Sequence, residues 1–276
     1  MAAQSNDLEA VTRLSLRSTK LIVVKIGSSS LSDSQGNIEQ MKINLLCEEL
    51  VRLRKNGLNV ILVSSGAIRS GKAVISNKIK NVEISCLQAY AAIGQVLLME
   101  SYRDIMANKG YNVAQILLTW DDFRNKKRLR NLVSTLNTLL SLGVIPIINE
   151  NDTIAVDEIK FGDNDTLSAL VSVQLKADLL VLLSDIDGLF TGDPSNSESK
   201  LLTFVSSVTS DLEKLVSEKH GGFGGMGTKL NAAKLVTEVG IPMVIANGNT
   251  EGVLGRLISG EKIGTIFSAR SENVKE

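Results

Sequence analysis

Histidine and cysteine are scarce in this sequence of 276 residues, which contains one histidine and two cysteines. We interpret His220, which adjoins a glycine-rich segment, as incidental, so catalysis by an imidazole base is not expected. Cys47 and Cys86 lie far apart in segments with a helical pattern and form no CxxC motif. This scarcity argues against a zinc site or a disulfide framework and fits a reducing cytoplasm.

Long apolar runs and an excess of charge are also missing. No run reaches the length of a membrane span, and the first twenty residues lack the apolar core of a signal peptide, so we expect a cytoplasmic protein with no membrane partner. Thirty basic residues balance thirty acidic ones, and the one basic run, at residues 124–130, is typical of a solvated helix face. Nothing therefore favours nucleic-acid binding, and the expected partners are small molecules.

Two common nucleotide-binding motifs are absent as well. No GxGxxG follows the first predicted strand, and no GxxxxGK[ST] follows any strand. A nucleotide site in this chain must therefore be of another type.

The sequence does contain a series of unbroken apolar runs, typical of strands buried on both faces. They occupy residues 21–24, 60–63, 144–148, 179–183 and 243–245. Segments with helical periodicity lie between them, for example residues 38–54 and 84–108. The alternation predicts an α/β fold in which helices cover a mainly parallel central sheet, with ligands bound beyond the carboxyl ends of the strands.

Two lysines, far apart in the sequence, each adjoin a glycine-rich turn. Lys25 lies in VKIGS at the end of the first predicted strand, and Lys229 follows GGFGGMGT just before a helical pattern at residues 230–239. The amides of such turns and the positive end of a helix bind phosphate, and an ammonium group adds full charge. Either turn alone is more often a connector, but the pair, with acidic motifs between, predicts phosphoryl transfer.

The acidic motifs between the lysines are INEND, at residues 148–152, and GDND, at residues 162–165. One of these residues is explained as the N-cap of a helix at residues 166–176, but a closely spaced set could also orient the lysines, contact magnesium or hold a substrate ammonium group. Ser65 and Gly66, after the second predicted strand, could donate backbone amides to a substrate carboxylate, with a tight turn as the alternative. Because no poised histidine or activated nucleophile is found, the phosphoryl acceptor is expected to need no deprotonation, as is true of a carboxylate.

Taken together, these motifs resemble the amino acid kinase family. The segments that carry the resemblance are VKIGS from Val24, SSGAI from Ser64, INEND from Ile148, GDND from Gly162 and GGMGTK from Gly224. The resemblance covers residues 20–268 and implies a three-layer αβα sandwich, the amino acid kinase fold, with an N-terminal arm or short helix at residues 1–19 and a tail at residues 269–276. The order of INEND and GDND is similar to that in members that phosphorylate the γ-carboxylate of L-glutamate.

The resemblance also implies roles for individual residues. Lys25 and Lys229 would stabilise the moving phosphoryl group, and Asp165 would position both ammonium groups. Glutamate would be bound by Ser65, Gly66, Asn149, Asp152 and Asn164. ATP would contact Lys25, Gly27, Ser28, Ser184, Asp185, Phe223, Gly224, Gly225, Met226, Gly227, Thr228 and Lys229, with residues 223–229 forming a loop over the phosphates, and Mg²⁺ would be held mainly by those phosphates.

Further implications of the resemblance concern the pathway and the assembly. The product would be L-glutamyl 5-phosphate, the first intermediate of proline biosynthesis and the substrate of a glutamyl-phosphate reductase, with feedback inhibition by proline and a homodimeric or homotetrameric enzyme. Two departures from the family pattern are expected: no C-terminal PUA domain, and Phe223 and Gly227 where small polar residues are frequent.

Two alternatives stay open. The first is a kinase of the same fold that acts on N-acetylglutamate or aspartate, and the second is a non-catalytic amino-acid sensor. Asp152 favours a substrate with a free α-ammonium group, because an acetylated nitrogen needs no anionic partner. The joint presence of Lys25, Asp165 and Lys229 favours catalysis, because binding alone does not require two lysines that face a phosphoryl group.

Overall fold

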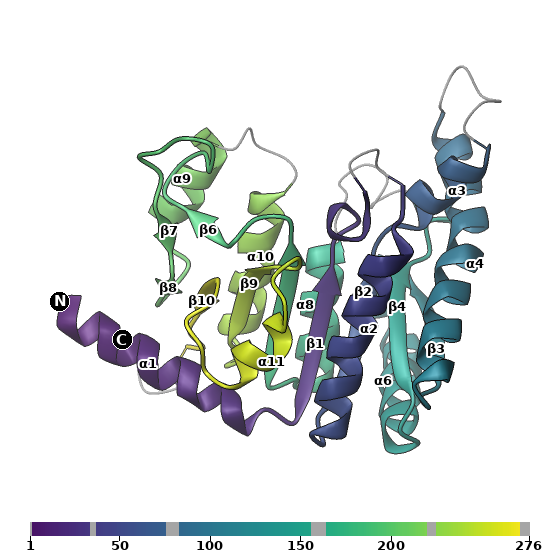
Figure 1. Ribbon diagram of the computed structural model, residues 1–276, viewed down its shortest axis with the longest axis horizontal. Helices are drawn as coiled ribbons and strands as arrows, with labels where there is room; N and C mark the ends of the chain where they lie inside the picture. The colour runs from purple at the N-terminus through teal and green to yellow at the C-terminus, as the bar shows by residue number, and fades with distance from the viewer. Residues whose placement is uncertain (1, 34–36, 76–82, 156–163, 220–224, 271–276) are drawn as a thin grey trace.

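The computed structural model describes residues 2–33, 37–75, 83–155, 164–219 and 225–270. A sheet with the strand order β3-β4-β2-β1-β5-β9-β10-β8 runs through the molecule (Figure 1). Neighbouring strands from β3 to β9 are parallel, whereas β10 is antiparallel to β9 and β8 follows the direction of β10. The mainly parallel sheet is therefore confirmed. In sheet order its strands are β3 (Val113–Leu118), β4 (Ile145–Glu150), β2 (Asn59–Ser64), β1 (Leu21–Ile26), β5 (Leu179–Ser184), β9 (Met243–Asn247), β10 (Thr265–Phe267) and β8 (Phe204–Val205).

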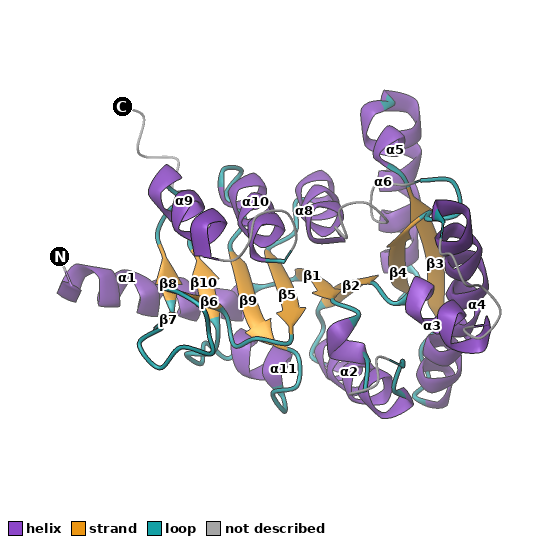
Figure 2. Ribbon diagram, turned by 90° about the horizontal axis from the view of Figure 1, so that it is seen from above, coloured by secondary structure: helices purple, strands orange, loops and turns teal. Residues whose placement is uncertain are grey.

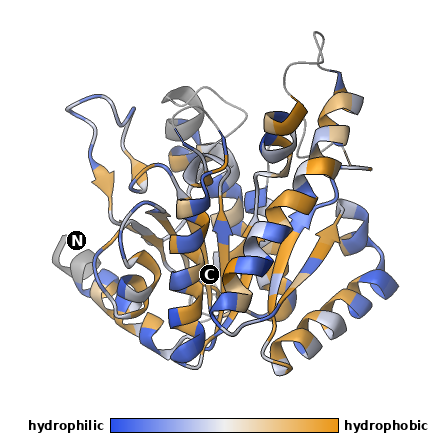
Figure 3. Cartoon of the chain, turned by 45° about the vertical axis from the view of Figure 1, so that its right-hand side comes forward, coloured by the Kyte–Doolittle hydropathy of each residue, from blue (hydrophilic) through white to orange (hydrophobic). Residues whose placement is uncertain are grey.

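Helices cover both faces of this sheet, which makes the three-layer αβα sandwich (Figure 2). One face packs against α2 (Gln40–Lys55), α4 (Ile84–Asn108) and α11 (Val253–Ile258), and the other against α6 (Lys126–Ser141), α8 (Asn164–Leu175) and α10 (Met226–Thr237). Figure 3 shows the central strands mainly in hydrophobic colours and the helices with mixed faces. The shorter elements are η2 (Ser29–Leu31), α3 (Ala67–Ile75), α5 (Trp120–Arg124), the paired strands β6 (Leu189–Phe190) and β7 (Leu201–Leu202), and α9 (Ser210–Lys219).

The alternation of side chains along β1 explains where Lys25 points. Ile22 and Val24 belong to the core beneath α2, and Val23 belongs to the core beneath α8 and α10. Because successive side chains of a strand point to opposite faces, Lys25 shares the face of Val23. The strand therefore directs the Lys25 ammonium group toward α8 and α10.

Two glycines allow α3 and α4 to pack backbone against backbone. A Cβ atom on Gly71 would lie 1.9 Å from the carbonyl oxygen of Tyr90, and one on Gly94 would lie 1.8 Å from the carbonyl oxygen of Ala67. No side chain fits at such distances, so glycine is required at both positions. This contact fixes the start of α3, which directly follows Ser65 and Gly66.

The N-terminal segment, expected as a loose arm or short helix, forms α1 (Ala2–Ser15) and the short turn η1 (Leu16–Ser18). Arg13 is buried, pairs with Glu9 at 2.9 Å, and donates hydrogen bonds to the carbonyl oxygens of Thr203 at 2.8 Å and Ile263 at 2.9 Å. This helix is therefore attached to the segments that lead into β8 and β10. Among the described residues, no helix combines the length and the apolar character that crossing a membrane requires.

Candidate active site

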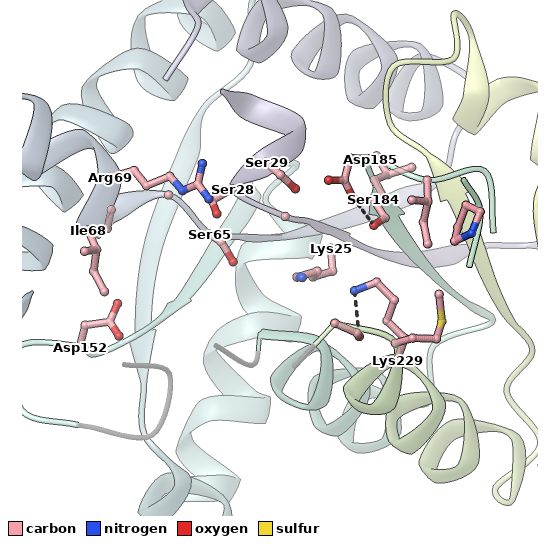
Figure 4. A pocket seen from close by; sticks show the side chains of 18 residues that line it. Lys25, Ser28, Ser29, Ser65, Ile68, Arg69, Asp152, Ser184, Asp185 and Lys229 are labelled. Carbon is pink, nitrogen blue, oxygen red and sulfur yellow. Dashed lines mark hydrogen bonds between the residues drawn. The ribbon is translucent and has the colours of Figure 1, made fainter. Parts of the chain in front are cut away.

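A cavity of about 600 Å³ opens at the carboxyl ends of the central strands. The strand β1 pairs with β2 on one side and with β5 on the other, and the cavity lies where these strands end. Such an edge is the usual ligand site of an open α/β sheet. Residues that line the cavity include Lys25, Ser28, Ser65, Arg69, Asp152, Ser184, Asp185, Met226 and Lys229 (Figure 4).

The two lysines that the sequence analysis singled out meet at one carboxylate. Lys25 Nζ lies 2.6 Å from Asp165 Oδ1, and Lys229 Nζ lies 3.0 Å from Asp165 Oδ2. Thr228 Oγ1 donates a further hydrogen bond of 2.9 Å to Asp165 Oδ2. All three charged side chains are buried, so the pairs are only weakly screened by water. The carboxylate thus holds two ammonium groups side by side at the cavity wall.

This arrangement perturbs the titration of Asp165. Burial by itself would raise the pKa of this carboxyl group, but the charges of Lys25 and Lys229 and the hydrogen bonds from them outweigh burial and hold the pKa well below its ordinary value. Asp165 is therefore ionised throughout the physiological range and keeps both lysines in place.

The helices that carry Asp165 and Lys229 begin earlier than the sequence predicted. The helix expected from residue 166 begins at Asn164, and the one expected from residue 230 begins at Met226. Asp165 therefore lies in a first turn, where the helix dipole favours an anion, and Lys229 lies in a first turn, where the dipole disfavours a cation. The bond to Asp165 compensates for the position of Lys229.

The early start of α10 corrects the expectation of a phosphate-covering loop at residues 223–229. Met226 to Lys229 form the first helical turn, with Gly225 as its N-cap at φ 81°. Phe223 and Gly224 lie outside the described residues, as do Gly162 and Asp163 of the GDND motif. What the described part offers at this point is a helix N-terminus that faces the cavity, since both Gly225 and Met226 line it.

A row of hydrogen-bonded polar side chains begins at Ser65, which lines the cavity. Asn164 Nδ2 donates to Ser65 Oγ at 2.9 Å and to Asn149 Oδ1 at 2.8 Å. Asn149 Nδ2 in turn donates to Gln95 Oε1 of α4 at 2.9 Å. These four side chains are buried, so the hydrogen bonds fix the orientation of each amide. Sequence reasoning missed Gln95, although a glutamine on the otherwise apolar buried side of a helix is a recognisable signal.

Two backbone amides that were expected to face ligands are already used. The Ser65 amide donates to the Ile26 carbonyl oxygen at 3.2 Å, and the Gly27 amide donates to the Leu183 carbonyl oxygen at 3.2 Å. Both bonds continue the ladders between neighbouring strands, which explains the difference. Gly66, which lines the cavity, has φ 115°, a conformation that favours glycine.

The opposite end of the cavity carries Ser184 and Asp185, which follow β5. Ser184 Oγ donates to Asp185 Oδ1 at 3.1 Å. In Figure 4, these residues and Lys229 lie toward one end of the cavity, Arg69 and Asp152 lie toward the other, and Lys25 lies between the two groups. Among the described residues, no group of three or more histidine, cysteine, aspartate or glutamate side chains is placed to hold a metal ion.

Comparison with known proteins identifies the family. Residues 20–247 match the model of the amino acid kinase family. The chain belongs to the amino acid kinase family. Its curated relatives include the glutamate 5-kinase of Clostridium tetani, 47% identical over 257 residues that make up 92% of this chain and 96% of that protein. The glutamate 5-kinase of Dictyoglomus turgidum is 46% identical over 250 residues, which span 90% of this chain and 67% of that protein.

Solved structures of other kinases share the amino acid kinase fold. Carbamate kinase from Giardia lamblia bound to AMP-PNP superposes with a TM-score of 0.64 at 17% identity, covering 92% of this chain and 100% of that one. UMP kinase from Bacillus anthracis superposes with a TM-score of 0.62 at 17% identity, covering 92% and 97%. At this identity, the likeness concerns the fold alone.

Proposed function

We propose that this chain has glutamate 5-kinase activity, in which the γ-phosphoryl group of ATP is transferred to the γ-carboxylate of L-glutamate. The products are L-glutamyl 5-phosphate and ADP, and the reaction is the first step of proline biosynthesis. The observation that carries the proposal is the buried pair of lysines bridged by Asp165 at the end of the central strand. The kinship with glutamate 5-kinases supports the choice of substrate.

In the proposed reaction, an oxygen of the γ-carboxylate attacks the γ-phosphorus of ATP. A new O–P bond forms, the bond from phosphorus to the oxygen bridging the β- and γ-phosphates breaks, and the electron pair leaves with ADP. No proton has to be removed, because the acceptor is ionised. The task of the protein is therefore to align two anions and to neutralise the charge on the moving phosphoryl group, which suits Lys25 and Lys229.

The acceptor is proposed to bind between Lys25 and the end of the cavity marked by Asp152. The Asp152 carboxylate would attract the α-ammonium group of glutamate, and the side chains of Ser65, Asn149 and Asn164 would surround the rest of the molecule. The Gly66 amide at the start of α3 would donate to a substrate oxygen. This placement directs the γ-carboxylate toward the lysine pair.

The nucleotide is proposed to bind at the end marked by Ser184 and Asp185, with its phosphates against Ser28, Gly225 and Lys229. Residues that fit a phosphate are present there: two buried ammonium groups and the N-terminus of α10. Mg²⁺, held mainly by the phosphates, would neutralise part of their charge. The ATP contacts expected of Phe223 and Gly224 stay predictions, because both residues lie outside the described part of the chain. Proline inhibition, supply of a reductase, a cytoplasmic location and a dimeric or tetrameric assembly stay predictions.

The test of this function is the formation of γ-glutamyl hydroxamate in hydroxylamine, dependent on ATP and Mg²⁺. L-Glutamate, N-acetylglutamate and L-aspartate are compared as acceptors. Hydroxamate from L-glutamate alone is expected, because Asp152 favours a free α-ammonium group and the γ-carboxylate must reach Lys25. Hydroxamate from another acid would change the assignment of the substrate. Binding of glutamate without hydroxamate from any acid would favour the sensor alternative.

The role of Lys229 is tested with a matched pair of variants on α10. Lys229→Ala is expected to lower kcat by about 100-fold or more with a smaller change in glutamate binding, because the lysine acts on the moving phosphoryl group. Lys234→Ala removes an exposed lysine that pairs with Glu213 at 3.1 Å and should leave kcat unchanged. Equal kcat values for both variants would remove Lys229 from the mechanism.

A further inference from the structure

One cation in the cavity wall differs from the others in its pairing. Lys25 and Lys229 are both bonded to Asp165. Arg69 also lines the cavity, and its Nη1 donates a hydrogen bond of 3.4 Å to Ser32 Oγ. Within the part of the chain that the structure describes, no carboxylate lies within ion-pair distance of its guanidinium group. Arg69 is therefore a charge at the site that the described residues do not neutralise.

The position of Arg69 in its helix has no evident structural purpose. It is the third residue of α3, and the first turn of this helix contains no acidic residue. A cation in a first turn faces the positive end of the helix dipole, so this position disfavours arginine for helix stability. The side chain is exposed and adds nothing to the core. A ligand anion would satisfy both the guanidinium group and the first turn of α3.

The place of Arg69 in the cavity indicates which anion it binds. It lies with Asp152 and Ile68 at the end of the cavity away from Ser184 and Asp185 (Figure 4). A guanidinium group and a carboxylate at the same end match the two charges of an α-amino acid, its α-carboxylate and its α-ammonium group. The phosphates of the nucleotide are proposed to lie against Ser28, Gly225 and Lys229, and a contact of Arg69 with them is the alternative that the KM for ATP tests.

We infer that Arg69 binds the α-carboxylate of the amino-acid substrate. This inference rests on the proposed function, because it assumes that the acceptor is an amino acid with a free α-carboxylate and a second carboxylate that reaches Lys25. Arg69 then selects for the charge at the α-position, while Asp165 and the lysines act on the γ-carboxylate and the phosphoryl group. It is a substrate-binding residue that affects affinity rather than the chemical step.

The experiment compares Arg69→Ala, Arg69→Lys and the control Lys72→Ala, which removes an exposed cation from the next turn of the same helix. For each protein, the KM values for L-glutamate and ATP, kcat and the Kd for L-glutamate without ATP are measured. The same constants are measured with the α-amide of L-glutamate, which lacks the α-carboxylate charge but keeps the γ-carboxylate and the ammonium group.

Arg69→Ala is expected to raise the KM and the Kd for L-glutamate about 10-fold, a value typical of a lost charge-assisted hydrogen bond at a partly exposed site. Its KM for ATP should stay within about twofold of the wild-type value, and so should its constants for the α-amide. Arg69→Lys should fall between the wild type and Arg69→Ala, because lysine keeps the charge but not the planar fork. Added salt should weaken glutamate binding to the wild type more than to Arg69→Ala.

Several outcomes would overturn the inference. An unchanged KM for L-glutamate, an equal loss for the α-amide, or a rise in the KM for ATP would each show that Arg69 does not read the α-carboxylate. Failure of the proposed function is seen separately, because the wild-type protein would then make no hydroxamate from L-glutamate. If Lys72→Ala raised the KM for L-glutamate as much as Arg69→Ala, the effect would be one of general surface charge and not of a specific contact.

Discussion

The bridge between the two lysines leads to a quantitative prediction for Asp165→Asn. An amide keeps the shape of the carboxylate but has one acceptor oxygen, so at most one lysine stays bonded and the NH₂ group faces the other ammonium. Removing one charge from a buried ion-pair network costs about 3–5 kcal/mol. Because the cavity admits water to the lysines, we expect a loss of about 3 kcal/mol in the free energy of unfolding.

We expect kcat of Asp165→Asn to fall even under conditions in which the variant is fully folded. The two ammonium groups repel each other once the bridge is neutral, so neither stays aimed at the moving phosphoryl group. Removing one preorganised electrostatic contact typically lowers kcat by about 10²–10³-fold, and we expect a loss in that range. MgATP should raise the Tm of the variant more than that of the wild type, because the phosphates supply the missing negative charge.

The pH dependence of this effect follows from the lowered pKa of Asp165. A carboxyl group whose pKa is lower in the folded protein than its ordinary value of 3.8 stabilises the fold above that value. This stabilisation is lost as the pH falls toward the lower pKa of the folded protein. The difference in unfolding free energy between wild type and Asp165→Asn should therefore be constant above about pH 5 and shrink below about pH 4.

The assays are urea denaturation, followed by circular dichroism, and the hydroxamate reaction. Asp178→Asn is the control. Asp178 Oδ2 accepts 2.8 Å hydrogen bonds from the amides of Lys20 and Leu21 at the amino ends of β1 and β5, away from the cavity. This change should cost about 1 kcal/mol and leave kcat unchanged. Wild-type turnover in a folded Asp165→Asn protein would refute the bridging role, and so would an equal effect of both variants.

Two further predictions concern contacts that hold the site in shape. In Gly94→Ala, the new Cβ would lie 1.8 Å from the Ala67 carbonyl oxygen, and an ordinary separation is about 3.3 Å, so α3 must move. We expect kcat/KM for glutamate to fall at least 10-fold. In the control Gly255→Ala, the new Cβ meets nothing within 4 Å, so kcat/KM should be unchanged. Arg13→Ala should lower the unfolding free energy in urea by about 3 kcal/mol, because it leaves carbonyl oxygens without their donor and removes the buried partner of Glu9, which keeps its bond to Lys262 at 2.9 Å. The exposed Arg17→Ala should cost under 1 kcal/mol. Equal effects within either pair of variants would contradict the contact concerned.

The sequence predicted the long interior strands of the sheet better than its edge strands and its short strands. The strands β1, β2, β4, β5 and β9 were found because burial on both faces requires unbroken apolar runs, and each of them lies inside the sheet. The edge strand β3 was missed: its sequence VAQILL has a polar residue in the middle, and only its last residue, Leu118, is buried. The strands β8 and β10 span only two and three residues, too few to show a pattern.

The same distinction applies to the candidate site. Lys25, Asp152 and Ser184 could be named from the sequence because polar residues at the ends of apolar runs must meet at one edge of a parallel sheet. Gln95 and Arg69 lie within helices. The position of Gln95 on a buried helix side is a signal of a polar partner, but only the packing shows that this partner is Asn149 and that Arg69 lines the cavity. The contact of α3 with α4 that turns both toward the site depends on Gly71 and Gly94, and two glycines in separate segments carry no sequence signal of being neighbours.

The distribution of charge along the cavity gives its two ends different tasks. At the phosphoryl end, Asp165 balances the lysines before any substrate arrives, so their geometry is fixed in advance and little reorganisation is needed during transfer. At the proposed acceptor end, no described carboxylate pairs with Arg69, so its charge would be available for binding and selecting the substrate. An unpaired exposed cation is stable without a partner, whereas two adjacent buried ammonium groups are not. Burial therefore explains why Lys25 and Lys229 need an internal carboxylate, whereas the exposed Arg69 could bind the proposed amino-acid substrate without one.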